Sequence, residues 1–534
     1  MTSEEKRFPS AARFRTRNSF GRIARTSMVW GYARTGVHTL VAIPTAIALA
    51  RLLSPTDFGI AATATFFGQL AAYLSSGGLG PALVRMKDIR EDHISSVFAI
   101  NVVMSALGAL ALIASAPYIA AFYNAPEVRW ILPVIALNFV FGAMTVIQQA
   151  LLARDLRYRE MATIGSLDVT VASCTAVVLA ALGFRYWSLV IGEVCGAFVK
   201  WIYGAWLVGS HLRFRFVPAA TRELISFAMG YYIRGLVEQF SRSLDKALIG
   251  RWLGVTSLGF YSKAQSLAVH AFTRMTVVGA GVSFRVFAII QDDPERFKRA
   301  YRKIIMTVTL VGYVVLGGLA AMGPNLIVVA FGERWGPSVV PFQIFCLVLA
   351  LRLTNKYTTA AANARGWIWP LVGCNVAEIA CVVVGVYVGS AWGITGVAVG
   401  MLITTIVTFL LMQSLMRAAT GFGLWEGLEP QMPALLTAAP IGLVLWVVGT
   451  VIGEWGAPPI AILAAQTCAI VALALAFAWW CPFAEVRELM HEIVSDISPR
   501  LAGFVWSDVA GDRARSRARR REAEAGVPSG GATQ

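Results

Sequence analysis

The segment MPALLTAAPIGLVLWVVGTVIGE, residues 432–454, has no charged side chain before its final glutamate. About 20 apolar residues in a row are enough for an α-helix to cross the hydrocarbon core of a lipid bilayer. The whole chain of 534 residues shares this character, because 57% of its residues are hydrophobic and only 14% are charged. A soluble domain carries about 25% charged residues. The composition therefore excludes a soluble globular protein and predicts an integral membrane protein.

Apolar segments of this kind recur along the whole chain and leave no room for a soluble domain. They predict an all-α membrane protein with about 14 transmembrane helices of roughly 20 to 25 residues each. The segments lie at 28–52, 59–83, 94–120, 130–153, 162–183, 186–208, 224–250, 257–284, 304–330, 338–363, 367–389, 391–416, 432–454 and 458–481.

Lysine and arginine are distributed unequally between alternate loops. Sixteen lie in the loops expected on the cytoplasmic side and five in the opposite loops. Because positive charge collects in the cytoplasmic loops of membrane proteins, the asymmetry predicts that both termini are cytoplasmic. The sixteen are Arg85, Lys87, Arg90, Arg154, Arg157, Arg159, Arg213, Arg215, Arg222, Arg296, Lys298, Arg299, Arg302, Lys303, Arg365 and Arg417, and the five are Arg51, Arg129, Arg185, Arg251 and Arg334.

The net charge of +16 is concentrated partly in the two tails, including the run RARSRARRR at 513–521. Such a charge is also compatible with binding to nucleic acid. Positive loops and tails that face an anionic membrane leaflet explain it more simply. Membrane lipids, and no nucleic acid, are therefore the expected partners of the basic tails.

Motifs for metal, nucleotide or disulfide chemistry are missing from the sequence. The seven cysteines have no C-x-x-C spacing, and the five histidines form no H-E-x-x-H pair. A G-x-x-x-x-G-K-[ST] phosphate-binding loop is also lacking. We therefore expect no catalytic residue, no metal site and no cofactor.

The sequence repeats itself weakly at an offset of 200 residues. ARLLSPTDFGIAATA at 50–64 aligns without gaps to GRWLGVTSLGFYSKA at 250–264. The alignment superposes the first two predicted spans on the seventh and eighth, so it indicates an internal structural repeat. Identical pairs are Tyr32/Tyr232, Arg34/Arg234, Arg51/Arg251, Leu53/Leu253, Thr56/Thr256, Gly59/Gly259, Ala64/Ala264 and Arg85/Arg285.

Six spans separate the two copies, so both enter the membrane from the same side and the repeat is parallel. This predicts two six-helix lobes around a central cavity, with spans 13 and 14 as an appendage. The predicted parts are a basic cytoplasmic tail (1–27), an N-lobe of spans 1–6 (28–210), a C-lobe of spans 7–12 (211–418), spans 13 and 14 (419–483), an interfacial amphipathic helix (484–510) and a disordered basic cytoplasmic tail (511–534).

Charged side chains within the predicted spans indicate where a polar substrate could bind. Each costs about 2.5 to 3.5 kcal/mol near the bilayer centre, so it normally faces a partner or water. The spans contain more bases than acids, and a basic cavity suits a phosphate group. The candidate cavity residues are Arg34, Arg234, Arg242, Lys246, Lys263, Arg274, Arg352 and Lys356, and the candidates for ion coupling are Asp168, Glu193, Glu238 and Glu378.

Simpler explanations exist for several of these charges. Glu238 and Arg242 are four residues apart and can form an ion pair within one helix. Arg34 and Lys200 lie where their side chains can reach the cytoplasmic headgroups. Interface anchoring is the better explanation for arginines at span ends, such as Arg51.

Three motif segments give the chain a family resemblance: LARLLSPTDFGIAA at 49–62, LDKALIGRWLGVTSLGFYSKA at 244–264 and FGERW at 331–335. The order of these segments along the chain, together with the fourteen predicted spans, resembles that of the polysaccharide transport family. That family belongs to the multidrug, oligosaccharidyl-lipid and polysaccharide exporter superfamily. The resemblance covers roughly residues 20–420 and does not include the tail.

The resemblance implies a flippase of the bacterial inner membrane and not an enzyme. Its substrate would be an undecaprenyl-diphosphate-linked oligosaccharide for O-antigen, capsule or exopolysaccharide assembly. Alternating access and a proton or sodium gradient would drive export, and polymerase and chain-length machinery would be further partners. An ion-coupled multidrug antiporter of the same superfamily, a membrane polysaccharide polymerase or ligase, and a non-transporting scaffold remain open alternatives.

Overall fold

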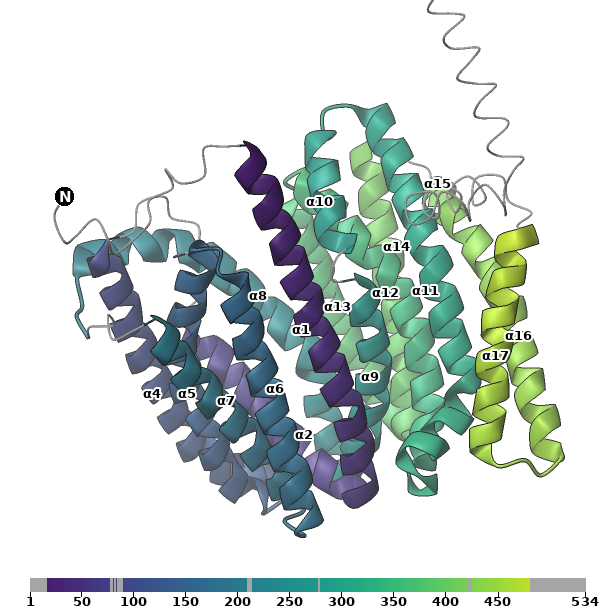
Figure 1. The fold of residues 1–534 in the computed structure, drawn as a ribbon, viewed down its shortest axis with the longest axis horizontal. Helices are drawn as coiled ribbons and strands as arrows, with labels where there is room; N and C mark the ends of the chain where they lie inside the picture. The colour runs from purple at the N-terminus through teal and green to yellow at the C-terminus, as the bar shows by residue number, and fades with distance from the viewer. Residues whose placement is uncertain are drawn as a thin grey trace, which may run out of the picture. The chain divides into compact units, whose positions relative to one another are not determined.

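The computed structural model describes residues 17–76, 80, 83, 90–208, 214–276, 279–420 and 424–480. Within these ranges every regular element is a helix, and no strand occurs (Figure 1). Nine helical stretches of the described residues are long and apolar enough to cross a membrane. The prediction of an all-α, multi-pass membrane protein is therefore confirmed.

Fourteen of the described helices have at least 22 residues. The count of fourteen membrane spans stays a prediction, because helices such as α8 carry too many charges to be identified by apolarity alone. The fourteen are α1 (Arg17–Leu52), α2 (Pro55–Ser76), α4 (Glu91–Phe122), α5 (Val128–Arg154), α6 (Tyr158–Ala181), α7 (Tyr186–Val208), α8 (Pro218–Trp252), α9 (Gly254–Thr276), α11 (Pro294–Phe331), α12 (Val339–Ala364), α13 (Ile368–Gly389), α14 (Gly393–Thr420), α16 (Met432–Glu454) and α17 (Pro459–Trp480).

Shorter helices complete the described chain. The segment predicted as one span at 257–284 overlaps α9 and a second helix, α10 (Gly279–Ile289), and residues 277–278 between them are outside the description. The remaining short helices are η2 (Glu333–Ser338), η3 (Ser390–Trp392), α15 (Leu424–Leu428) and η4 (Glu429–Gln431). The predicted interfacial helix and C-terminal tail lie outside the described residues.

The chain forms two compact units. Unit 1 comprises residues 1–266, 330–341 and 372–404, and unit 2 comprises residues 267–329, 342–371 and 405–534. Their boundaries differ from those of the two predicted six-helix lobes, and the division into lobes stays a prediction.

Close helix packing in unit 1 depends on small residues. A Cβ at Gly192 of α7 would lie 2.7 Å from the Ala172 carbonyl oxygen, and one at Gly196 would lie 2.8 Å from the Asp168 carbonyl oxygen, both on α6. Glycine therefore allows α6 and α7 to approach backbone to backbone, as small residues commonly do between membrane helices. Near them, α2, α4 and α5 enclose an apolar core that includes Ile131.

Unit 2 is held together by aromatic packing and by buried amides. Phe287, Phe297 and Tyr301 form one buried cluster with the end of α12. Gln431, at the entrance to α16, is 3% exposed and accepts hydrogen bonds from the Tyr313 hydroxyl at 2.7 Å and the Thr354 hydroxyl at 3.1 Å. The neighbouring helices α16 and α17 form an antiparallel pair (Figure 1).

Candidate functional site

An ion pair joins α6 and α7 in unit 1. The Lys200 ammonium lies 3.1 Å from the Asp168 carboxylate, and each side chain is a little under one-third exposed. The pair lies beside Gly196, whose missing side chain leaves room for the Asp168 carboxylate. The two residues are 32 positions apart in the sequence, so no local pattern pairs them. The contact explains how two opposite charges share this part of a helical bundle.

Two more predicted residues lie on the same group of helices. Glu193 of α7 accepts a hydrogen bond of 3.5 Å from the Thr65 hydroxyl of α2. The Arg34 guanidinium of α1 lies against Gly165 of α6, where even a Cβ atom would crowd it. Gly165 is one helical turn before Asp168, so the arginine and the Asp168–Lys200 pair follow one another along α6. The helices α1, α6 and α7 therefore contribute both acidic and basic side chains to this region of unit 1.

Asp245 of α8 is a buried carboxylate that the list of coupling candidates omitted. It is 1% exposed and accepts hydrogen bonds of 2.9 Å from both the Tyr261 hydroxyl and the Gln265 amide of α9. The Lys246 backbone N–H also donates to it at 2.8 Å. The spacing of Tyr261 and Gln265, four residues apart on the next helix, was the available signal for a shared partner.

Lys263 of α9 is surrounded by protein groups. Its side chain is 9% exposed, its ammonium donates a 3.0 Å hydrogen bond to the Ala46 carbonyl oxygen, and it lies 4.5 Å from the ring centre of Phe58 and 4.6 Å from that of Phe331. Such contacts stabilise a buried ammonium through the negative faces of the rings. The predicted role of Lys263 in binding substrate stays a prediction.

The other predicted residues are dispersed. Lys246, Glu238 and Glu378 are half-buried in unit 1. In unit 2, the half-buried Arg352 and the exposed Lys356 are one helical turn apart on α12. The side chains of Arg234, Arg242 and Arg274 lie outside the described residues.

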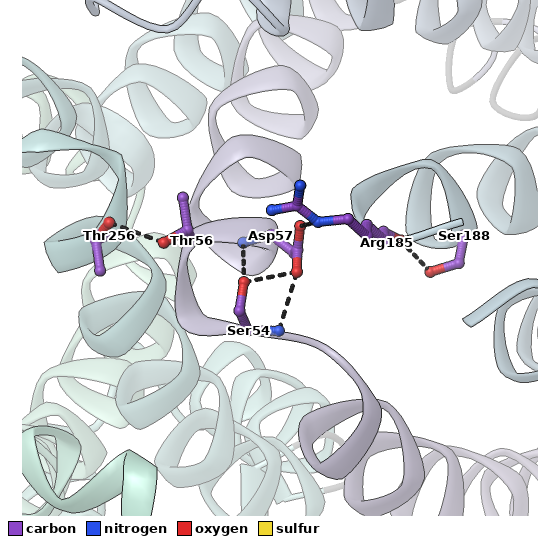
Figure 2. A network of polar contacts seen from close by, with 6 residues as sticks. All are labelled: Ser54, Thr56, Asp57, Arg185, Ser188 and Thr256. Atoms are coloured by element: carbon purple, nitrogen blue, oxygen red, sulfur yellow. Dashed lines mark hydrogen bonds and ion pairs between the residues drawn. The ribbon is translucent and has the colours of Figure 1, made fainter. Parts of the chain in front are cut away.

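A polar network organises the start of α2 (Figure 2). The Ser54 hydroxyl accepts a hydrogen bond from the Asp57 backbone N–H at 3.2 Å, while the Asp57 carboxylate accepts one from the Ser54 backbone N–H at 3.0 Å. This is a reciprocal N-terminal cap, with Pro55 in the first helical position. The Arg185 guanidinium, from the loop before α7, lies 3.3 Å from the nearly fully buried Asp57 carboxylate.

The same view shows a contact between the two copies of the sequence repeat. The hydroxyls of Thr56 and Thr256 are 3.0 Å apart, and the two residues are separated by 200 positions (Figure 2). They are one of the identical pairs of the repeat. The offset found in the sequence therefore corresponds to a physical meeting of equivalent residues.

Comparison with known proteins gives matches to proteins of polysaccharide biosynthesis and transport. A family model described as "Polysaccharide biosynthesis protein" matches residues 48–340. The lipopolysaccharide biosynthesis protein WzxC of Escherichia coli K12 is 23% identical over 412 residues, which cover 74% of this chain and 83% of that protein. The succinoglycan biosynthesis transport protein ExoT of Rhizobium meliloti is 28% identical over 306 residues, 57% of this chain and 61% of that protein.

Two solved structures share the fold. The lipid II flippase MurJ, in an inward closed conformation, matches with a TM-score of 0.67 and 13% identity, over 84% of this chain and 98% of that chain. An inward-facing multidrug resistance MATE family transporter of the MOP superfamily matches with a TM-score of 0.56 and 15% identity, over 72% and 96% of the two chains. At these identities, the likeness concerns the fold alone.

Proposed function

This chain belongs to the polysaccharide biosynthesis protein family, and from that premise we propose that it is a flippase for a lipid-linked oligosaccharide. The substrate is an oligosaccharide on undecaprenyl diphosphate, moved from the inner to the outer leaflet of the bacterial inner membrane. The observation that carries the proposal is the family match over residues 48–340, which extends from the end of α1 to the start of α12. The match therefore covers most of the membrane helices and does not depend on one short motif.

Basic side chains of both units support a substrate with a diphosphate group. Arg34 and Lys246 in unit 1 and Arg352 and Lys356 in unit 2 all keep solvent-accessible surface. A guanidinium donates paired, charge-assisted hydrogen bonds to phosphate oxygens. In the proposed cycle basic side chains of this kind bind the diphosphate as the protein alternates between inward and outward access, and no covalent bond is made or broken.

Acidic groups of unit 1 are the proposed coupling sites. A proton or sodium ion must bind a group whose charge or contacts change during the cycle, and carboxylates within membrane helices serve this purpose. Asp168 has a lysine partner at 3.1 Å, whereas the described partners of Asp245 are neutral donors. We therefore place Asp245 beside Asp168, Glu193, Glu238 and Glu378 as a candidate for coupling.

The location and partners follow from the same proposal. The chain would lie in the bacterial inner membrane with both termini in the cytoplasm, as the distribution of lysine and arginine between loops predicts. Polymerase and chain-length machinery would use its product on the outer side of that membrane.

A multidrug antiporter is the second candidate, favoured by the fold shared with the MATE transporter. An antiporter for organic cations requires acidic and aromatic groups around its substrate. In this chain the predicted spans contain more bases than acids, and Arg34, Lys246, Arg352 and Lys356 keep accessible surface. The flippase accounts better for these side chains, and the family match also favours it.

Deletion of the gene separates the two candidates. Undecaprenyl-diphosphate-linked repeat units and surface polysaccharide are measured in the same cells. The flippase proposal predicts that the linked units accumulate on the inner leaflet, that surface polymer is lost, and that the intact gene restores both. Unchanged polymer together with altered drug tolerance would contradict it and favour the antiporter.

A further inference from the structure

In unit 2, α10 and the start of α11 form a hairpin, residues 279–303, that projects past the ends of α16 and α17 (Figure 1). The ring of Phe287 on α10 packs against Phe297 and Tyr301 on α11, with centroids 5.1 and 6.3 Å apart. The Arg302 guanidinium of α11 lies 3.0 Å from the carboxylate of Glu429, directly before α16. The first eight residues of α11 therefore extend about 12 Å past the entrance of α16, on the side predicted to be cytoplasmic.

An apolar stripe on α10 is left uncovered by the described residues. Val282, Val286 and Ile289 recur at spacings of four and three, which place them on one face of the helix. Their side chains are 52%, 37% and 82% exposed. Because Phe287 packs beside Tyr301, the last turn of α10 lies past the entrance of α16, where apolar side chains meet water instead of lipid. A partner that removes this surface from water would therefore be stabilising.

A basic stripe follows the start of α11. Arg296, Arg299 and Lys303 are exposed and recur at spacings of three and four. Arg296 also forms an ion pair of 3.2 Å with Asp293, and both side chains are exposed. In each helix the exposed stripe comes about a third of a turn before the residues that pack the hairpin together, so in this antiparallel pair both stripes border the same side. The hairpin contains six basic and three acidic residues and is net positive.

The segment that follows α17 has the complementary pattern. Residues 484–497, AEVRELMHEIVSDI, lie outside the described residues, and their sequence predicts an amphipathic helix. Four acids recur at spacings of three, four and four, next to a stripe of apolar residues. With these four acids and one arginine, the segment is net negative. The acids are Glu485, Glu488, Glu492 and Asp496, and the apolar residues are Val486, Leu489, Ile493 and Ile497.

The acidic stripe disfavours the membrane surface as the place of this helix. Amphipathic helices that lie on a membrane are typically rich in lysine and arginine on their polar face. The cytoplasmic leaflet is negatively charged, so it repels a row of four carboxylates. The hairpin of α10 and α11 offers both an apolar stripe and the opposite charge.

The path of α17 leads this segment toward the hairpin. The side-chain amides of Asn325 on α11 and Gln466 on α17 are 3.4 Å apart. Further along, Ile470 of α17 packs against Gly318 of α11, where it would collide with a Cβ. The two helices therefore run antiparallel, and Trp480 at the end of α17 is level with the part of α11 about ten residues before Gly318. The three residues that follow α17 can span about 10 Å, which is enough to reach the basic stripe.

We propose that residues 484–497 fold back as a helix and dock on the exposed side of the α10–α11 hairpin. The apolar stripe of the segment covers the apolar stripe of α10, and its carboxylates face the basic stripe of α11. The docked helix ties the end of the last membrane helix to the cytoplasmic tip of unit 2. This intramolecular contact goes beyond the proposed function and does not depend on what the chain transports.

Cross-linking tests the docked position in the full-length chain, with its native cysteines replaced by serine or alanine. Ile289→Cys is combined in turn with Leu489→Cys, Ile493→Cys or Ile497→Cys. On mild oxidation of membranes, one of these pairs should cross-link within a single chain at least fivefold faster than Ile289→Cys with Ser495→Cys. Ser495 is the matched control, because it lies on the opposite face of the same predicted helix. Equal rates for all pairs, or a cross-link that joins two chains, would overturn the docking.

A charge exchange tests the basic stripe. Glu488→Lys together with Glu492→Lys should slow the fastest cross-link several-fold, because the segment then repels α11. Adding Arg299→Glu and Lys303→Glu should restore most of the rate, since opposite charges face each other again. Elution on gel filtration checks that each variant is folded. Cross-linking that is not slowed, or that does not recover in a folded chain, would overturn the docking.

Accessibility separates docking from a position on the membrane surface. In the same cysteine-free background, Ile289→Cys is labelled with an impermeant thiol reagent in inside-out vesicles, with and without Glu488→Lys and Glu492→Lys. Docking predicts several-fold faster labelling in the charge variant and unchanged labelling of Gln291→Cys, which is exposed at the turn of the hairpin. Equal labelling of Ile289→Cys, with quenching of a fluorophore on Ile493→Cys by quenchers in the lipid, would place the segment on the membrane and overturn the docking. Since no readout uses export, the docking and the proposed function can fail separately.

Discussion

The two units stabilise their buried polar groups in different ways. Among the described residues, unit 1 contains charged groups in its interior, including Asp57, Asp245 and the Asp168–Lys200 pair. In unit 2 the buried polar contacts of the described residues are made by neutral amides and hydroxyls, such as Gln431 with Tyr313. The ion pair between Arg302 and Glu429 lies nearer the surface, and each of its two side chains is 43% exposed. Neutral buried bonds hold helices without a charge that must be compensated. The carboxylates proposed for ion coupling all belong to unit 1, and we expect the buried neutral contacts of unit 2 to be structural.

The largest effect is expected from Asp245→Asn in unit 1. The amide keeps the shape of the side chain but removes the charge that could bind a proton or a cation, so export should fall roughly tenfold or more. Surface polymer is measured at equal amounts of protein in the membrane. Glu454→Gln, an exposed control in unit 2, should export normally. Full export by Asp245→Asn would remove Asp245 from the coupling candidates.

Gln431→Leu in unit 2 should reduce stability and leave the transport rate of each folded molecule unchanged. The leucine leaves the buried Tyr313 hydroxyl without its acceptor, at a cost of about 1 to 3 kcal/mol. Thermal unfolding of the purified protein measures the loss. Adding Tyr313→Phe should recover part of it, because the unpaired hydroxyl is then absent. A variant of normal stability that exports poorly would contradict the structural role of Gln431.

The Asp168–Lys200 pair should show a smaller coupling energy, because both side chains are partly exposed. A double-mutant cycle with Asp168→Asn and Lys200→Met should give about 1 kcal/mol of interaction in unfolding free energy. Export should fall in Asp168→Asn if this acid takes part in coupling. A coupling energy near zero would show that the two charges act independently.

The smallest effect is expected for Arg302→Ala in unit 2. Its ion pair with Glu429 is exposed on both sides, and exposed pairs contribute about 0 to 1 kcal/mol. Unfolding temperature and export should both remain close to those of the parent chain. A large loss of export from this variant would contradict the expectation that this ion pair of unit 2 has no role in transport.

The helical architecture could be predicted because its signals are local. Apolar segments of sufficient length identify membrane helices, and the 200-residue offset identifies Thr56 and Thr256 as equivalent residues, although it does not predict that they are in contact. The partners of charged residues could not be predicted in this way. Lys200 pairs with Asp168, and Lys263 contacts Phe331 and the Ala46 carbonyl, because helices that are distant in sequence pack together.

The burial of Trp335 also could not be predicted from the sequence. In the sequence, a tryptophan after a predicted span is typical of the membrane interface. In the structure it is fully buried and donates a hydrogen bond to the end of α1. Trp335 can make this contact because residues 330–341 belong to unit 1, whereas the segments before and after them, 267–329 and 342–371, belong to unit 2. No local sequence pattern predicts that assignment.

Reconstitution tests the central claim most directly. The purified chain is placed in liposomes with a labelled undecaprenyl-diphosphate-linked oligosaccharide, an ion gradient is applied, and the sugar that reaches the opposite leaflet is measured with an impermeant reagent. The flippase account predicts translocation that depends on the wild-type protein and is strongly reduced in Asp245→Asn. Translocation no faster than in protein-free liposomes, from a correctly folded and inserted protein under either a proton or a sodium gradient, would contradict it.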